Sequence, residues 1–314
     1  MNKWKTFLGG LLLAAIVLAG CGQQDAAAPP SNSQKGGVAG QDIDRTLAAD
    51  DDGEVLVSNI AGSVLIHGWD KKEVRVTGEL GKGTRELVFE RNGSHVEIRV
   101  EIEKGKHRRV HGTDLEIWLP QNSEIKVITV SADIEVEGVH GDQRLQSVSG
   151  TVDTLIWEND LEVRSISGDV NVVGHGHAGM VTVNLVSGDA DIENVSGEIE
   201  VQSVSGDLDL ELVDIVVARV RSTTGDMELS GKLAKGARVD VESINGDAII
   251  MLVGPVNAEI EIETFNGDID NCFGPQAQRT SKYAPGRELK FTAGDGNGEI
   301  RIKTLNGDVT LCKK

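Results

Sequence analysis

Carboxylates at a regular spacing are the residues of this chain best placed to do chemistry. From residue 129 to the C-terminus a phrase recurs in which Gly is followed by Asp, with Ala132 in place of Gly in the first copy and Thr151 in place of Asp in the second. Carboxylates stacked about 5 Å apart repel by roughly 0.8 kcal/mol per pair in water, so N–H groups, solvent or cations must offset the repulsion. The recurring residues are Asp133, Asp169, Asp189, Asp207, Asp226, Asp247, Asp268 and Asp308.

Three roles are open to this carboxylate ladder: a turn Asp that bonds its own backbone, a Ca²⁺ site, and a surface that a partner recognises. The turn role is favoured, because the spacing matches neither the glycine-rich calcium roll nor an EF-hand loop. Two His pairs, His175 with His177 and His107 with His111, lack nearby Cys ligands and are predicted to lie in solvated loops. The second pair belongs to a basic patch, residues 104–111. The sequence therefore predicts no metal and no cofactor.

Catalytic motifs are missing from the sequence. No Gly-x-Ser-x-Gly elbow with a plausible His partner occurs, and no phosphate-binding Gly-x-x-x-x-Gly-Lys. The alternative is an enzyme that cleaves acidic polysaccharides with an Asp cluster, Ca²⁺ and a basic residue. Its only candidate bases are Arg164, Arg219 and Arg221, which the strand pattern directs outward into solvent. We expect a protein that is not an enzyme.

Two cysteines are candidates for a disulfide. Cys272 and Cys312 each lie five residues after a repeat glycine, Gly267 and Gly307. If those repeats are neighbouring coils, the two cysteines lie on adjacent strands near 5 Å apart, within disulfide range. The 40-residue step between the glycines is then explained by a long excursion, 274–296, which lacks a clean strand pair.

The N-terminus carries an export signal. Lys3 and Lys5 precede an apolar stretch, residues 7–18, which is too short for a comfortable transmembrane helix. The following Leu-Ala-Gly-Cys resembles the lipobox of bacterial lipoproteins, which implies cleavage before Cys21 and acylation of Cys21, for example with palmitate. Gly22 stands where lipoproteins kept in the inner membrane usually carry Asp. The resemblance therefore implies a lipid-anchored envelope protein, in the outer membrane if the cell is Gram-negative.

The repeat itself predicts the architecture. Successive copies are 18, 18, 20, 18, 19, 21, 21 and 40 residues apart, and an aliphatic column lies five residues before each glycine. A period near 20 with apolar and polar residues in alternation indicates a solenoid in which each coil stacks on the next. Because Asn-Gly between alternating strands is also a hairpin signal, an antiparallel meander is the alternative.

These observations divide the chain into four parts. Residues 1–20 are the signal peptide, and 21–52 are the lipidated cysteine and a flexible tether rich in Ala, Ser, Gly and Pro. Residues 53–128 alternate like strands and are predicted to form an N-terminal β segment that caps the stack. Residues 129–314 are predicted to form the solenoid. The predicted class is all-β: a single-chain β-solenoid with coils of about 20 residues and two strands per coil.

The amino-acid composition restricts the classes of molecule that this protein can bind. The chain has 50 acidic and 31 basic residues, a net charge of −19 that becomes about −21 when Lys3 and Lys5 are removed with the signal peptide. Such a surface excludes nucleic acid and direct adsorption to anionic lipid head groups. Aromatic residues make up only 3% of the chain, so stacking platforms for sugars are scarce.

Residues 53–314 resemble a bacterial domain-of-unknown-function family whose members carry the name putative adhesin. The resemblance rests on the repeated Ser-Val-Ser-Gly-Asp and Asn-Gly-Asp phrases and on the closing segment 298–309. It implies an acidic β-solenoid that acts as a scaffold or adhesin-like binding module, with links to envelope stress and with an unknown protein or glycan ligand. The family brings no catalytic residues to carry over. The rival interpretations are the polysaccharide-active enzyme and a Ca²⁺-dependent surface protein.

Overall fold

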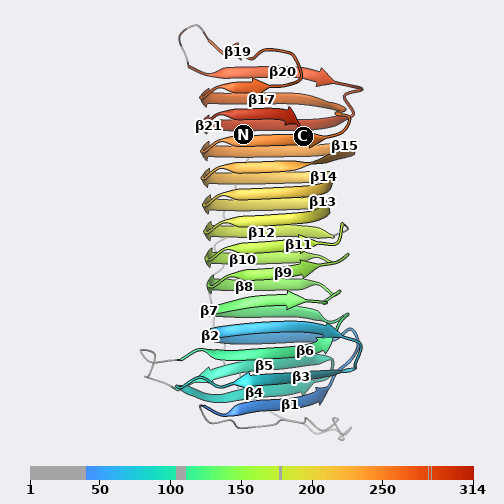
Figure 1. The fold of residues 1–314 in the computed structure, drawn as a ribbon, viewed down its shortest axis with the longest axis vertical. Coiled ribbons are helices and arrows are strands. Elements are labelled where there is room, and N and C mark those ends of the chain that lie inside the picture. The colour runs from blue at the N-terminus through green and yellow to red at the C-terminus, as the bar shows by residue number, and fades with distance from the viewer. Residues whose placement is uncertain (1–39, 104–110, 177–178, 282, 284) are drawn as a thin grey trace, which may run out of the picture. The chain divides into compact units, whose positions relative to one another are not determined.

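The computed structural model describes residues 40–314 except 104–110, 177–178, 282 and 284. These residues belong to one compact unit, Ser31–Lys314. All regular secondary structure in the described part is β-strand, so the all-β class predicted from the sequence is confirmed. The strands lie one above the next (Figure 1).

Each repeat forms a rung, made of a strand on one face, a glycine corner, and a strand on the opposite face. In one rung β10 (Leu161–Ser167) leads through Gly168 into β11 (Val170–Gly174). β10 pairs in parallel with β8 (Gln143–Ser149) and β12 (Met180–Ser187), so that Val163 lies opposite Leu145 and Val183. Equivalent residues of successive repeats are thus direct neighbours, and the antiparallel meander does not occur among these rungs.

We call the face before the glycine corner face A and the face after it face B. Long strands pass through a corner or a connection and contribute to both faces. Face A contains residues 124–130 of β7 (Glu124–Glu137), β8, β10, β12, the second parts of β13 (Ala190–Ser205), β14 (Leu208–Thr224) and β15 (Met227–Asn245), then β21 (Gly298–Asn306) and β17 (Ala258–Asn266). Face B contains residues 132–137 of β7, β9 (Val152–Ile156), β11, the first parts of β13, β14 and β15, then β16 (Ala248–Val253), β22 (Val309–Lys313) and β18 (Ile269–Asn271).

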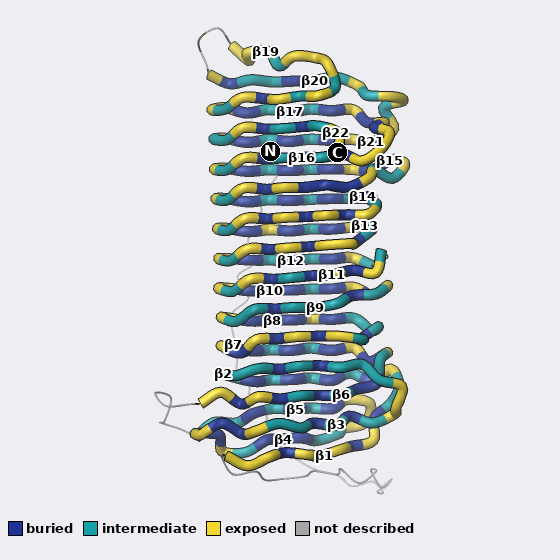
Figure 2. The backbone as a smooth tube through the Cα atoms, viewed as in Figure 1, coloured by how far each residue is buried: buried dark blue, intermediate teal, exposed yellow. Residues whose placement is uncertain are grey.

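The core lies between the two faces. Side chains alternate between inside and outside along each strand, so Val163 of face A and Val172 of face B both have no exposed surface. Figure 2 shows the alternation as dark blue segments repeated from rung to rung. A column of Ser and Thr lines the interior next to the corner, where Ser165 Oγ donates to the Gly168 carbonyl oxygen at 3.2 Å.

The corner needs glycine for two reasons. Gly206 has a φ of 130°, which side chains of L-residues rarely adopt, and a Cβ placed on it would lie 2.0 Å from the Gly188 carbonyl oxygen of the neighbouring rung. Most other corners have a positive φ as well. The recurring glycine thus allows rungs to stack closely at this edge.

The N-terminal strands extend the stack beyond β7. β2 (Glu54–Trp69) pairs in parallel with β7 on one side and with β5 (His95–Ile102) and β6 (Thr113–Pro120) on the other. Antiparallel strands follow: β4 (Thr84–Asn92) on β5, and β3 (Glu73–Glu79) on β6.

One strand lies inside the predicted tether. β1 (Asp42–Ala48) pairs with β3 in antiparallel fashion and buries Ile43 and Leu47. The assignment of residues 21–52 to a flexible tether is therefore wrong for 42–48. The reason is that two apolar residues suffice for an edge strand with one face on the core, and the polar residues between them hide the pattern. Residues 21–39 lie outside the described part.

The C-terminal rung occupies an unexpected place. β21 pairs in parallel with β15 on one side and with β17 on the other, so the last rung in the sequence lies between the two rungs that precede it. β20 (Arg287–Ala293) then covers β17 as an antiparallel strand and pairs with β19 (Gln278–Arg279). The expectation that 274–296 lacks a strand pair is wrong, because the unpaired edge of β17 offers hydrogen bonds that a polar strand can take.

Candidate functional surfaces

The corner aspartates form an ordered ladder. Asp207 Oδ1 accepts the backbone N–H of Asp226 at 2.8 Å, and Asp226 Oδ1 accepts that of Asp247 at 2.8 Å. The same bond joins Asp189 to Asp207 and Asp133 to the N–H of Thr151. The sequence favoured a turn Asp that bonds its own backbone, whereas in the structure these carboxylates accept the backbone N–H of the next rung. The repulsion between stacked carboxylates is thus offset by N–H groups.

The ladder follows the spatial order of the rungs. Asp247 accepts the N–H of Asp308 at 2.7 Å, and Asp308 accepts that of Asp268 at 2.7 Å. At the end of the ladder the Arg287 guanidinium of β20 pairs with Asp268 at 2.5 Å. Among the described residues no group of three or more His, Cys, Asp or Glu side chains is arranged to hold a metal ion. One oxygen of each bonded carboxylate is occupied by a neighbouring rung.

The outward side of face B is strongly acidic. Its three outward columns, at one, three and five residues after each corner, contain seventeen Asp and Glu residues and no Lys or Arg. Besides the corner ladder they are Glu135, Glu137, Asp153, Asp191, Glu193, Asp209, Glu211, Glu228 and Asp270. Basic side chains from outside the columns reach it at Asp268, as above, and at Glu211, where Lys314 Nζ lies 2.6 Å away.

The pKa of one carboxyl group on face B, that of Asp209, is raised. Burial raises the pKa of the Asp209 carboxyl, and the neighbouring carboxylates of Glu228 and Asp191 raise it further. Ionised carboxylates without counter-ions disfavour one another, which is the physical cause of the second contribution. Neighbouring carboxylates on face B therefore repel one another, and a bound cation or cationic partner would reduce this repulsion.

Face A has a different electrostatic character. Its two columns at four and six residues before the corner contain seven basic and six acidic side chains. Several are paired across rungs: Arg221 Nε with Glu242 at 3.1 Å, and Lys303 Nζ with Glu263 at 3.3 Å. A hydrogen bond from Lys290 of β20 lowers the pKa of Glu261. This part of face A is nearly neutral in a strongly acidic chain.

An exposed apolar stripe borders face A at the corner. It consists of the residue two positions before each corner glycine, and eight of the nine described rungs place a large apolar side chain there, 42–52% exposed. In spatial order the stripe is Val130, Val148, Ile166, Val186, Val204, Thr223, Ile244, Leu305 and Phe265. Sequence reasoning did not single out this column, although its period is the same as that of the aspartates.

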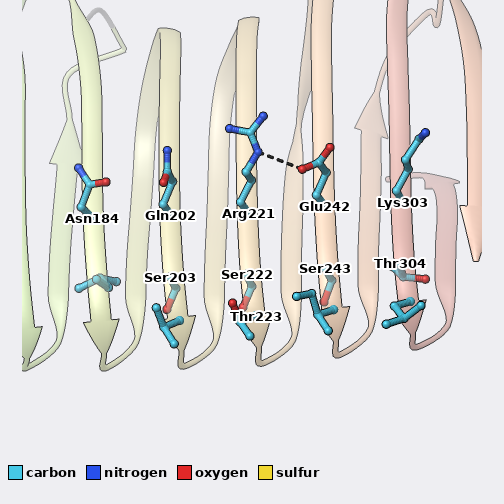
Figure 3. A pocket seen from close by; sticks show the side chains of 14 residues that line it. Asn184, Gln202, Ser203, Arg221, Ser222, Thr223, Glu242, Ser243, Lys303 and Thr304 are labelled. Carbon is cyan, nitrogen blue, oxygen red and sulfur yellow. Dashed lines mark hydrogen bonds and ion pairs between the residues drawn. The ribbon is translucent and has the colours of Figure 1, made fainter. Parts of the chain in front are cut away.

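A shallow groove runs beside the stripe. Its volume is about 610 Å³, and it lies between the stripe residues Val204, Thr223 and Ile244 and the column of charged and amide side chains. Figure 3 shows Asn184, Gln202, Arg221, Glu242 and Lys303 as a row across five neighbouring strands, with the ion pair between Arg221 and Glu242 marked. The groove thus joins an apolar edge to a polar row of both charges.

Each of the two His pairs has one member outside the described residues. His175 stacks on Trp157 with ring centroids 4.0 Å apart, and His140 packs on the other side of Trp157 at 4.4 Å. His175, the first residue after β11, therefore packs against an aromatic ring. His177 and His107 lie outside the described residues, as does the basic patch 104–111 apart from His111.

The candidate bases of an enzyme lie on face A, away from the corner ladder. Arg164 pairs with Glu162, and Arg221 pairs with Glu242. Arg219 is an outward residue of the same face. The Asp ladder lies round the corner on face B, so these three arginines and the ladder do not form a common cleft.

Cys272 and Cys312 are joined in a disulfide, with Cα atoms 4.9 Å apart. The bond connects the segment that follows β18 to β22, which are neighbours through the parallel pairing of Ile269 with Val309. The covalent link thus fastens the inserted C-terminal rung to the rung that covers it. Cys21 lies outside the described residues.

The fold and these surfaces define an all-β repeat protein with two chemically different faces. The chain belongs to the Toastrack DUF4097 family, whose model matches residues 56–312. No curated protein matches the sequence. Among the described residues no helix is long and apolar enough to cross a membrane.

Several solved structures are similar to this chain at low sequence identity. A protein from Bacteroides fragilis, described as a "putative adhesin", is 13% identical with a TM-score of 0.42, covering 87% of this chain and 97% of that one. A "putative lipid binding protein" from Parabacteroides distasonis is 13% identical with a TM-score of 0.29, covering 87% and 99%. A "putative cell adhesion protein" from Clostridium sporogenes is 11% identical with a TM-score of 0.22, covering 87% and 100%. Similarity this low gives no ground for assigning the functions of these proteins to this chain.

Proposed function

We propose that this chain is a lipid-anchored, non-enzymatic protein of the cell envelope that presents face B as a binding surface for a cationic protein or glycan ligand. The observation that supports the proposal is the separation of charge. Seventeen carboxylates and no Lys or Arg lie in the outward columns of face B, whereas the two outward columns of face A at four and six residues before the corner are nearly neutral. A face of one sign attracts ligands of the other sign and speeds their association.

The proposal includes the cellular location of the protein. The basic start, the apolar stretch and the Leu-Ala-Gly-Cys phrase favour cleavage before Cys21 and acylation of its thiol. With Gly22 after the cysteine, the outer membrane is the destination in a Gram-negative cell. A scaffold held by a lipid can collect partners at the membrane, which fits a role in envelope maintenance or in the response to envelope stress.

The anchor is tested by fractionation. We expect the wild-type chain to incorporate labelled palmitate and to sediment with membranes. Cys21→Ser should lose the label and leave the membrane fraction. Retention of Cys21→Ser in the membrane, without label, would contradict a lipid anchor.

The binding surface is tested with two sets of charge-removing substitutions on the full chain. The first set is Asp191→Asn, Asp209→Asn and Glu228→Gln on face B. The matched set is Glu200→Gln, Asp240→Asn and Glu242→Gln on face A, which removes the same charge. We expect a cationic peptide to bind wild type in a salt-dependent manner, with binding weakened by the first set and retained by the second. Equal loss in both sets would show that only net charge matters.

Turnover is measured in the same samples. Glycan and peptidoglycan fragments are incubated with the wild-type chain, with and without Ca²⁺, and the products are analysed by mass spectrometry. Binding without cleavage is the expected result. Cleavage that persists after purification would favour the polysaccharide-active enzyme, and binding that requires Ca²⁺ would favour the Ca²⁺-dependent surface protein.

A further inference from the structure

The apolar stripe is a surface feature that the fold itself does not need. Val201, three residues earlier on the same strand β13, is fully buried and supplies the core, whereas Val204 is 51% exposed. Thr223 occupies the same column, which shows that a polar residue fits there. The stripe is apolar over five successive rungs, from Val130 to Val204, and again from Ile244 through Leu305 to Phe265. Contiguous patches of this kind mark contact surfaces.

The spacing of the stripe restricts what can cover it. Rungs are about 4.8 Å apart, so apolar side chains recur at that interval along the stack. A peptide extended along the stack presents residues to one side about every 6.7 Å, and a helix presents a turn every 5.4 Å. Both therefore drift out of step within a few rungs. A second stack of parallel strands has the same interval and stays in step over the whole stripe.

The charges beside the stripe also permit a second copy. Two acidic chains repel at most orientations, and two copies of face B would bring seventeen carboxylates on each side together. The two outward columns of face A nearest the stripe, however, hold seven basic and six acidic side chains, several of them already paired, as Arg221 is with Glu242. Of the two faces, face A is therefore the one on which two copies can meet with the smaller electrostatic repulsion.

We propose that two copies of this chain associate through the apolar stripe of face A. Each copy covers the stripe of the other, and both acidic faces remain turned outward. The pair thus exposes two ligand-binding faces of the kind proposed above, although the association itself does not depend on that ligand.

Cysteine cross-linking of the full chain in isolated envelopes tests the pairing. Val204 lies on the middle one of the nine described rungs, so it faces its own counterpart whether the two copies run parallel or antiparallel. The matched control is Val173, a 41% exposed valine on face B. With Cys272 and Cys312 joined, Val204→Cys and Val173→Cys each add one free thiol. Oxidation should give a disulfide-linked dimer for Val204→Cys and none for Val173→Cys.

Charged substitutions provide the second measurement. Ile166→Asp and Ile244→Asp, each combined with Val204→Cys, should abolish the cross-linked dimer, while Val173→Asp in the same background should leave it intact. Circular dichroism and the melting temperature check that each variant is folded. Equal dimer from Val204→Cys and Val173→Cys would overturn the proposal. Protection of the Val204→Cys thiol from a water-soluble maleimide without any dimer would also overturn it, because a different occupant would then cover the stripe.

Discussion

Asp207 accepts the backbone N–H of Asp226 through its Oδ1 at 2.8 Å, and the two residues lie on neighbouring rungs. The same kind of bond recurs along the corner: Asp133 accepts the N–H of Thr151, and Asp247 accepts that of Asp308. A side chain of one repeat thus satisfies a backbone donor of the next, and the charge of the carboxylate strengthens the bond. The repeated aspartate is in this respect a connection between rungs.

Replacing Asp207 separates its hydrogen bond from its charge. Asp207→Ala removes the acceptor of the Asp226 N–H and should lower the free energy of unfolding by about 1 kcal/mol. Asp207→Asn keeps an Oδ1 acceptor and removes one charge from a crowded row. Its free energy of unfolding should therefore fall by less than that of Asp207→Ala, or rise. Denaturant unfolding of the full chain measures both. A cost for Asn as large as that for Ala would mean that the charge, not the acceptor, is what the ladder needs.

Gly206 tests the close stacking at the corner. Gly206→Ala places a Cβ 2.0 Å from the Gly188 carbonyl oxygen at a φ of 130°, so we expect a loss of more than about 3 kcal/mol from strain and overlap. Gly254→Ala is the control, because Gly254 also has a positive φ, 79°, but no atom lies within 4 Å of the added Cβ. It should cost about 1 to 2 kcal/mol. Thermal and denaturant melts compare the two, and equal losses would refute the packing explanation.

The sequence predicts the period, the alternation and the glycine corner because each depends on residues close together in the chain. Side chains such as Val163 and Leu145 occupy the same position of the repeat and become direct neighbours. The donor to Asp207 was not predictable in the same way, since the N–H of its own turn and that of Asp226 are equally plausible partners without coordinates. The apolar stripe could have been found by tabulating the column that contains Val204.

The order of the last rungs cannot be deduced from the columns. Val241, Ile262 and Ile302 are equivalent aliphatic residues, so any order of the three rungs aligns them equally well. In the structure Ile302 lies between Val241 and Ile262. This order depends on the long connection 272–297 and on the cover that β20 gives to β17, both of which are tertiary features.

Asp209 predicts a dependence of stability on pH. Its pKa is raised in the folded protein, so between its unfolded value and the raised value the folded state holds more protons than the unfolded state. Stability therefore falls as the pH rises through that interval and stays lower above it. Asp209→Asn should raise the melting temperature at neutral pH and low salt, and the gain should disappear below the unfolded pKa and shrink at high salt.

The control for Asp209 is Asp70→Asn, which removes one charge from an exposed turn that follows β2 and does not belong to the face B columns. Melting temperatures of both variants and of wild type are measured across the acidic range at two salt concentrations. If Asp70→Asn raises the melting temperature as much as Asp209→Asn, the effect comes from net charge and not from the crowding of Asp209 by Glu228 and Asp191.

The Cys272–Cys312 bond should stabilise the inserted C-terminal rung. It closes a loop of 40 residues, for which the loss of unfolded-state entropy corresponds to roughly 4 kcal/mol. We expect a dithiol reductant to lower the melting temperature of wild type, and the double variant Cys272→Ser, Cys312→Ser to melt at that lower temperature with or without the reductant. Hydrogen exchange should locate the loss: amides of β21, β22 and β17 become less protected, whereas those of β10 do not. Because β21 lies between β15 and β17, its release would unpair both, so a loss of protection confined to the chain end at Lys314 would contradict the inserted order of the rungs.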